Sequence, residues 1–249
     1  MKFLKLMILS LLALPMAAQA GEVLDPFYAP APGHVLSKTS FTFGNNKLEN
    51  GIKTESQTLN ETIYYGINPS WTLFLDASNT WNDPDNSAKY EVRYWDIGLG
   101  YFFEPAENTS LDLELYYTES KPEEMDKDKN LYFYGRYDFM KDQDVKPFIG
   151  LEYARNLHQI TKSHEWGRAF AGLWTKVNGF LVRADILARY VPDTPESTDI
   201  ALRMETGYQF TEKFALDLYA SYDIYNHAER NPIDTDRNCS AGIMAKILF

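Results

Sequence analysis

The chain has 249 residues, a formal net charge of −11 and a single cysteine, and 15% of its residues are aromatic although its mean hydropathy is negative. Nucleic acid is excluded as a partner because an acidic surface repels phosphate. An internal disulfide is excluded because Cys239 has no second cysteine to pair with. A helical membrane protein is excluded because no segment holds 18 consecutive apolar residues.

The first twenty residues have the pattern of a secretory signal peptide. Two lysines precede an apolar stretch from Leu6 to Met16, and the small-residue triplet Ala18-Gln19-Ala20 follows it. The stretch is too short for a membrane anchor, and Pro15 interrupts it. We therefore expect residues 1–20 to be removed during export, and no cysteine follows the cleavage site to carry a lipid.

The next segment, residues 21–34, reads GEVLDPFYAPAPGH and contains three prolines without any alternation. This composition predicts an extended arm outside any sheet. The arm is either a simple periplasmic leader or a plug, in which Phe27 and Tyr28 fold back into the domain that follows.

From residue 35 onward, apolar and polar residues alternate with a period of two. Examples are Leu111 to Thr118, LDLELYYT, and Phe214 to Tyr225, FALDLYASYDIY. The expected strands are longer than the five or six residues that are usual in soluble sheets, and their length suits tilted strands that cross a membrane. These strands cover residues 35–44, 55–67, 71–82, 90–103, 111–119, 131–140, 147–158, 166–177, 180–190, 199–210, 214–225 and 239–249.

The connections between these strands alternate between short turns and longer, more charged loops, as in barrels whose turns face the periplasm. We therefore predict an all-β fold, a single antiparallel up-and-down transmembrane β-barrel of about twelve strands over residues 35–249. Residues 104–110 are long for a turn and residues 159–165 are short for a loop, so ten or fourteen strands are the alternatives.

The C-terminal sequence CSAGIMAKILF ends in Phe249 and has an apolar residue at every second position before it. This pattern resembles the signal by which outer-membrane barrels are recognised by their assembly machinery. In size and strand number the chain resembles the twelve-stranded monomeric channels of Gram-negative bacteria, such as the oligogalacturonate- and sialic-acid-specific porins and the nucleoside channel. The resemblance implies a monomer in the outer membrane, in contact with its lipid and lipopolysaccharide. It carries no family motif, so it assigns no functional residue.

Ionic side chains are expected to face the barrel interior, because Arg or Lys facing lipid at mid-membrane costs about 2–4 kcal/mol. The third to fifth strands then form an acidic wall, and the eighth to tenth form a mixed wall that is basic on balance. The acidic wall consists of Asp76, Asp96, Asp112 and Glu114. The mixed wall consists of Arg168, Lys176, Arg183, Asp185, Arg189, Arg203 and Glu205, and Arg136 and Lys246 complete the predicted lining.

This lining has two interpretations. It produces a transverse field across a water-filled lumen, or it forms a network of ion pairs that blocks a narrow barrel. Inward glycines, Gly98, Gly100, Gly150, Gly172, Gly207 and Gly242, favour open space. Inward rings refill that space or form a track for sugar rings, and they are Phe102, Tyr132, Tyr134, Phe170, Trp174 and Tyr219.

Catalytic and metal sites are weakly indicated. Ser163 and His164 are adjacent, so on a strand they would point to opposite faces, and no third residue orients the imidazole. The four histidines are too scattered for a metal site. We therefore predict a passive channel for small hydrophilic solutes, without a cofactor. A closed structural or interaction barrel with acidic loops is the alternative, and an outer-membrane lipid hydrolase is the third hypothesis.

Overall fold

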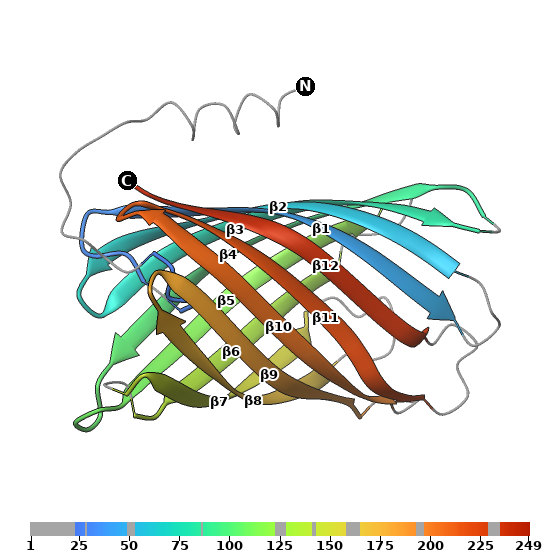
Figure 1. The fold of residues 1–249 in the computed structure, drawn as a ribbon. Helices are drawn as coiled ribbons and strands as arrows, with labels where there is room; N and C mark the ends of the chain where they lie inside the picture. Colours follow the sequence, from blue (N-terminus) through green and yellow to red (C-terminus); the bar gives the residue numbers. More distant parts are fainter. Residues whose placement is uncertain are drawn as a thin grey trace.

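The computed structural model describes residues 23–27, 29–48, 53–85, 87–122, 128–140, 143–157, 165–192, 197–228 and 235–249. Twelve strands form one closed barrel (Figure 1). The strands are β1 (Val35–Leu48), β2 (Lys53–Asn68), β3 (Trp71–Pro84), β4 (Tyr90–Phe103), β5 (Ser110–Pro122), β6 (Asp128–Asp138), β7 (Val145–Asn156), β8 (Glu165–Val177), β9 (Phe180–Val191), β10 (Ser197–Thr211), β11 (Phe214–Ala228) and β12 (Thr235–Leu248). No helix in the described residues is long and apolar enough to cross a membrane.

Every strand pairs antiparallel with its neighbours in the chain, and β1 pairs with β12 to close the barrel. At the seam Leu36 lies opposite Leu248, and the backbone N–H of Phe249 donates to the carbonyl oxygen of Val35 at 2.8 Å. Closure gives hydrogen-bond partners to the backbone N–H and C=O groups of β1 and β12, which would otherwise be unpaired in the membrane. The predicted fold, including twelve strands rather than ten or fourteen, is confirmed.

Several strands continue further than the alternation predicts, at the end opposite the short turns. β1 reaches Leu48 rather than residue 44, and β12 begins at Thr235 rather than residue 239. The sequence of these extensions no longer alternates between apolar and polar residues, while backbone pairing continues. At the opposite end the turns are tight. Asn178 and Gly179 have φ angles of 51° and 81°, which is the geometry of a type I′ hairpin turn.

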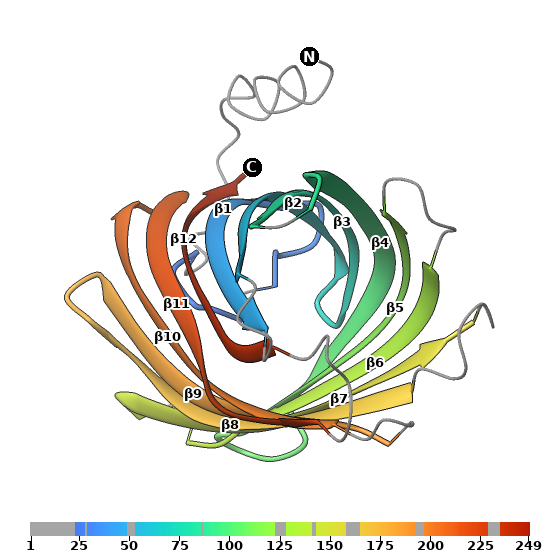
Figure 2. The same cartoon turned by 90° about the vertical axis from the view of Figure 1, so that its right-hand side faces the viewer.

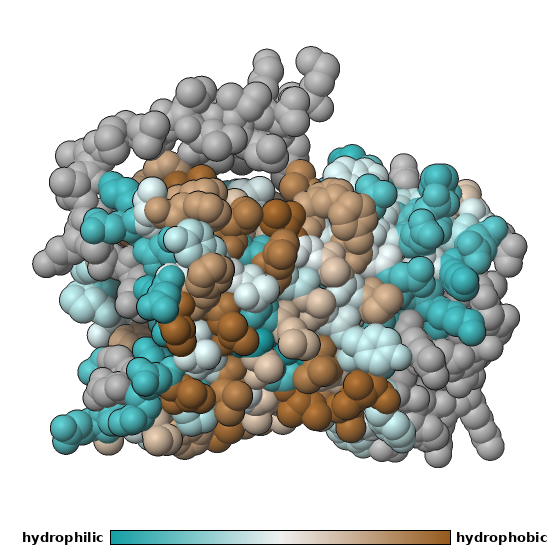
Figure 3. All heavy atoms as spheres, in the orientation of Figure 1, coloured by the Kyte–Doolittle hydropathy of each residue, from teal (hydrophilic) through white to brown (hydrophobic). Residues whose placement is uncertain are grey.

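The outer face of the barrel is apolar around its middle (Figure 3). One large apolar side chain after another is exposed there, including Leu99, Leu115, Leu151, Met204 and Leu218. Hydrophilic residues gather toward the two ends of the view. This inside-out distribution is the one expected of a barrel whose solvent is lipid.

A polar exception lies on the outer face of β1 and β2. Glu61 occupies an outward position between Leu59 and Ile63, and its carboxylate accepts hydrogen bonds from the hydroxyls of Ser37, at 2.6 Å, and Thr39. These two hydroxyls on the neighbouring strand supply partners that lipid cannot supply. The simple assignment of apolar residues to lipid did not predict this cluster.

The inward glycines do not leave the open space that their size suggests. A Cβ on Gly98 would meet the ring of Phe74, and one on Gly150 would meet the ring of Phe170. The side chain of Tyr219 similarly lies where a Cβ of Gly242 would be. These glycines therefore make room for neighbouring rings, which corrects the expectation that they widen the lumen.

The described part of the N-terminal segment, residues 23–27 and 29–34, lies inside the ring of strands rather than beside it (Figure 2). It enters at the end of the short turns. There the N–H of Gly33 donates to the carbonyl of Gly66 at 2.8 Å, and the N–H of Gly66 donates to the carbonyl of His34 at 3.1 Å. A side chain at Gly66 would collide with the carbonyl oxygens of Pro30 and Ala31, so the path of the segment requires glycine at this position.

Candidate functional site: the lumen and the N-terminal segment

The predicted acidic residues of β3 to β5 lie on the inner face. The two on β3 and β4 accept hydrogen bonds from neutral donors. Asp76 accepts hydrogen bonds from Asn60, at 2.9 Å, and from the hydroxyl of Thr62. Asp96 is 3% exposed and accepts from the Tyr94 hydroxyl at 2.7 Å.

Asp76 and Asp96 are direct cross-strand partners, so two carboxylates face each other across the β3–β4 ladder. Such like-charged pairs are unfavourable unless other groups stabilise them. The amide and hydroxyl donors on neighbouring strands do so here.

The other two predicted acids lie on β5. The Arg136 guanidinium on β6 is 3.4 Å from Asp112, and its Nε is 3.1 Å from Asp138. Glu114 occupies the next inward position along β5, opposite Tyr134. Because Arg136 is 4% exposed, it is a buried cation enclosed by two carboxylates.

The predicted basic residues of β8 to β10 are all engaged with an acceptor. Arg168 pairs with Glu152, Arg189 pairs with Asp199 at 2.5 Å, and Lys176 donates to Gln209 at 3.3 Å. Sequence reasoning did not assign Glu152 and Asp199 as lining residues. Their inward phase on β7 and β10 could have identified them.

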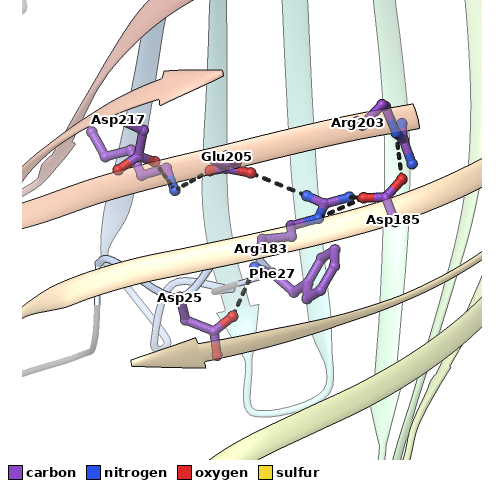
Figure 4. Close-up of polar contacts among 8 residues, drawn as sticks. Asp25, Phe27, Arg183, Asp185, Arg203, Glu205 and Asp217 are labelled. Carbon is purple, nitrogen blue, oxygen red and sulfur yellow. Dashed lines mark hydrogen bonds and ion pairs between the residues drawn. The ribbon is translucent and has the colours of Figure 1, made fainter. Parts of the chain in front are cut away.

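Six charged side chains form one continuous chain across β12, β11, β10 and β9, which we call the charge ladder (Figure 4). Its members are Lys246, Asp217, Glu205, Arg183, Asp185 and Arg203. Lys246 contacts Asp217 and lies 3.4 Å from Glu205. Arg183 then lies 3.2 Å from Glu205 and 2.8 Å from Asp185, which is 2.5 Å from Arg203.

The charge ladder contains three cations and three carboxylates, so its formal charge is balanced. The expectation of a wall that is basic on balance omitted Asp217, which is fully buried beside Lys246. Burying charges at this depth is favourable only when each has a partner of opposite sign and good geometry. The ladder is therefore a rigid wall whose charges are already paired.

The N-terminal segment docks against inward side chains of β6, β7 and β9. Val23 and Leu24 are fully buried. The ring of Phe27 meets Phe148 of β7 edge-on, with the ring centroids 5.0 Å apart. The guanidinium carbon of Arg136 is 3.6 Å from the Phe27 centroid, and that of Arg183 is 4.7 Å away. Tyr28, the other residue predicted to form a plug, lies outside the described residues.

Asp25 is half-buried beside Phe27 (Figure 4), and its carboxylate accepts a hydrogen bond from the backbone N–H of Phe27 at 2.8 Å. Burial raises the pKa of Asp25 above its ordinary value, because it removes water from the charged form. The Phe27 N–H and the nearby charges of Arg136 and Lys146 act in the opposite direction.

A cavity of about 420 Å³ lies where the segment, the short turns and the lumen wall meet. It is bordered by Phe27, Arg136, Lys146 and Trp174, together with prolines of the segment. The ammonium of Lys146 lies 4.5 Å above the Trp174 ring. This volume is within the range of small-molecule sites.

Aromatic side chains line the inner face from β2 to β8. Tyr64, Phe74, Tyr116, Tyr132 and Trp166 follow one another with centroid separations between 4.7 and 5.7 Å. A second group joins Tyr134, Phe170 and Phe148. Phe74 and Tyr116 belong to this aromatic surface, although sequence reasoning did not select them.

The candidate catalytic pair, Ser163 and His164, lies outside the described residues, as do parts of the acidic loops. Within the described ranges no three metal-binding side chains come together.

No family model matches the sequence, and no curated protein matches it. Solved structures do match. The COG4313 outer membrane channel from Pseudomonas putida F1 is 11% identical, with 90% of this chain and 98% of that chain aligned at a TM-score of 0.69.

The same fold occurs in a porin and in an autotransporter translocator domain. The NanC porin is 9% identical over 85% of this chain and 98% of its own, at a TM-score of 0.61. The translocator domain of the autotransporter NalP from Neisseria meningitidis is 12% identical over 90% of both chains, at a TM-score of 0.59. The predicted resemblance to twelve-stranded channels and the predicted outer-membrane location agree with these comparisons. At such identities the likeness concerns the fold and assigns no solute.

Proposed function

We propose that the protein is a monomeric, passive channel for small hydrophilic solutes in the outer membrane, narrowed by its own N-terminal segment. The observation that carries the proposal is the inner face. Charged groups line it from Asp96 on β4 through Arg136 and Arg183 to Lys246 on β12, whereas apolar side chains occupy the outer face. A polar lining of this kind lets water and polar solutes cross a membrane, and its charges select among them.

The lining charges are held in fixed positions by their partners. Paired and hydrogen-bonded side chains are held in place, so the charge ladder and the Asp76–Asp96 pair form two fixed walls of the lumen. The resulting pathway presents charge and aromatic faces together. Both suit polar, ring-shaped solutes.

The direct test is purified protein in a planar lipid bilayer. We expect ionic conductance from the full mature chain and a larger conductance from a variant that lacks residues 21–33, because the docked segment occupies part of the cross-section. Equal conductance of both chains would remove the narrowing role of the segment. Absence of conductance from both, at every salt concentration and voltage tried, would reject the channel.

The docked segment and the balanced charge ladder favour one alternative, a closed barrel with a structural or binding role. This alternative predicts that neither chain conducts. The bilayer experiment therefore separates the two functions, provided that folding is first verified by the heat-dependent migration typical of outer-membrane barrels.

A further inference from the structure

We propose that the place held by the Phe27 ring is a binding site for a small aromatic carboxylate, and that the N-terminal segment is a built-in competitor for it. The inference rests on the proposed channel function, because the solute would reach this place through the lumen. It adds a solute class and a role for the segment that the fold alone does not assign.

The first part of the site is a slot for a flat ring. Arg136 on β6 and Arg183 on β9 place their guanidinium carbons 3.6 and 4.7 Å from the centre of the Phe27 ring. Phe148 meets the same ring edge-on at 5.0 Å. Guanidinium groups bind aromatic faces through the negative potential of the ring.

Both arginines keep their places without Phe27. Arg136 is held by Asp112 and Asp138, and Arg183 is held by Asp185 and Glu205. Because these carboxylates fix the guanidinium planes, the slot persists when the segment leaves. Their charges are already balanced, so the slot attracts a π face more than a further anion.

The second part of the site is a cation for the carboxylate. Lys146 borders the same cavity as Phe27 and Arg136, and its ammonium lies over the Trp174 ring. Its positive charge acts on Asp25 while the segment is docked, and Asp25 leaves the cavity together with Phe27. A ring in the Phe27 slot with a carboxylate directed into the cavity would therefore find an unused positive partner.

The segment itself carries the same two groups. Phe27 supplies the ring, and Asp25, two residues earlier, supplies a carboxyl beside the same arginine and lysine. Burial raises the pKa of Asp25, so this carboxyl is a poorer anion than a free aromatic acid. A solute that combines both groups in one rigid molecule can therefore displace the segment.

The test uses benzoate as the probe and the full mature chain in detergent, with binding measured by calorimetry. Phe27→Ala removes the competitor and leaves the barrel strands unchanged. If the segment occupies the slot nine-tenths of the time, its removal strengthens apparent benzoate affinity about tenfold. Phe27→Leu, which keeps much of the bulk without a π face, is expected to give an intermediate gain.

Three comparisons make the result specific. Cyclohexanecarboxylate has the same charge without an aromatic face, so we expect it to bind Phe27→Ala more weakly than benzoate does. Lys146→Gln, combined with Phe27→Ala, is expected to cancel most of the gain. Lys213→Gln, a lysine of the β10–β11 turn outside the cavity, is the matched control and is expected to leave benzoate binding unchanged.

Benzoate binding that is equal in the natural chain and in Phe27→Ala would overturn the inference, and so would equal binding of the two acids. Conductance of potassium chloride by the same preparations judges the proposed function separately. A conducting protein without the benzoate preference rejects only the aromatic site. A protein that conducts in no variant rejects the channel and, with it, the route to the site.

Discussion

The two sides of the lumen hold their carboxylates in different ways. On β3 and β4, Asp76 and Asp96 face each other and are held by amide and hydroxyl donors. On β9 to β12, Asp185, Glu205 and Asp217 are held by cations in the charge ladder. The first arrangement leaves negative charge directed at the lumen, whereas the second cancels it. The first wall is acidic in sequence, whereas the second carries cations beside its carboxylates, so only the first wall carries a net negative field.

The largest effect is expected from breaking the ladder at its buried end. Lys246→Met removes the cation shared by Asp217 and Glu205 and leaves two carboxylates close together without it. Loss of one partner from a buried pair typically costs about 3–5 kcal/mol. Denaturant unfolding in detergent should show a loss of this size. The double variant Lys246→Met with Asp217→Asn should recover part of it, and no recovery would argue against the pairing.

The next effect concerns the N-terminal segment inside the lumen. Gly66→Val places a side chain against the carbonyl oxygens of Pro30 and Ala31, so the segment can no longer follow its path. We expect a severalfold rise in single-channel conductance and faster proteolysis of the segment. Gly44→Ala is the matched control, because its new methyl group meets only the flexible hydroxyl of Ser56. An unchanged conductance in Gly66→Val would contradict a narrowing role.

A substitution in the acidic wall is expected to change the stability of the protein little and the ion selectivity of the channel clearly. Asp76→Asn keeps one acceptor for Asn60 and Thr62 and relieves the repulsion from Asp96, so the change in stability should stay within about 1 kcal/mol. The reversal potential in a potassium chloride gradient should shift toward lower cation preference. A comparable shift in Glu205→Gln, with retained folding, would remove the distinction between the walls.

The smallest effect is a pH dependence of segment docking. Because burial raises the pKa of Asp25, the docked segment binds a proton more tightly than the released one. Docking is therefore strongest in acid and weakens as pH rises through the raised pKa. The charges that face Asp25 are Arg136, Asp138 and Lys146. Conductance should rise with pH over this window in the natural chain, and Asp25→Asn should flatten the profile.

The sequence alone was sufficient for the compartment and the architecture. Strict alternation, as in LDLELYYT, has one structural solution when the runs are long, and Phe249 sets the phase that sends Ile243 outward and Lys246 inward. These features depend on local backbone geometry, which each strand carries in its own residues. The same period did not predict Glu61, because its two hydroxyl partners come from another strand.

The tertiary structure decided which charges remain unpaired and what fills the lumen. Asp217 meets Lys246, and Phe27 meets Arg136 and Arg183, only because barrel closure and tilt bring distant strands together. The inward glycines predicted open space, yet rings and polar side chains of neighbouring strands occupy it. Each strand by itself determines which of its side chains point inward. Which charges pair, and which side chains fill the lumen, depends on the register and curvature of all twelve strands. For this reason the sequence alone predicted the strands of the barrel, and only the tertiary structure showed which side chains and which segment fill the lumen.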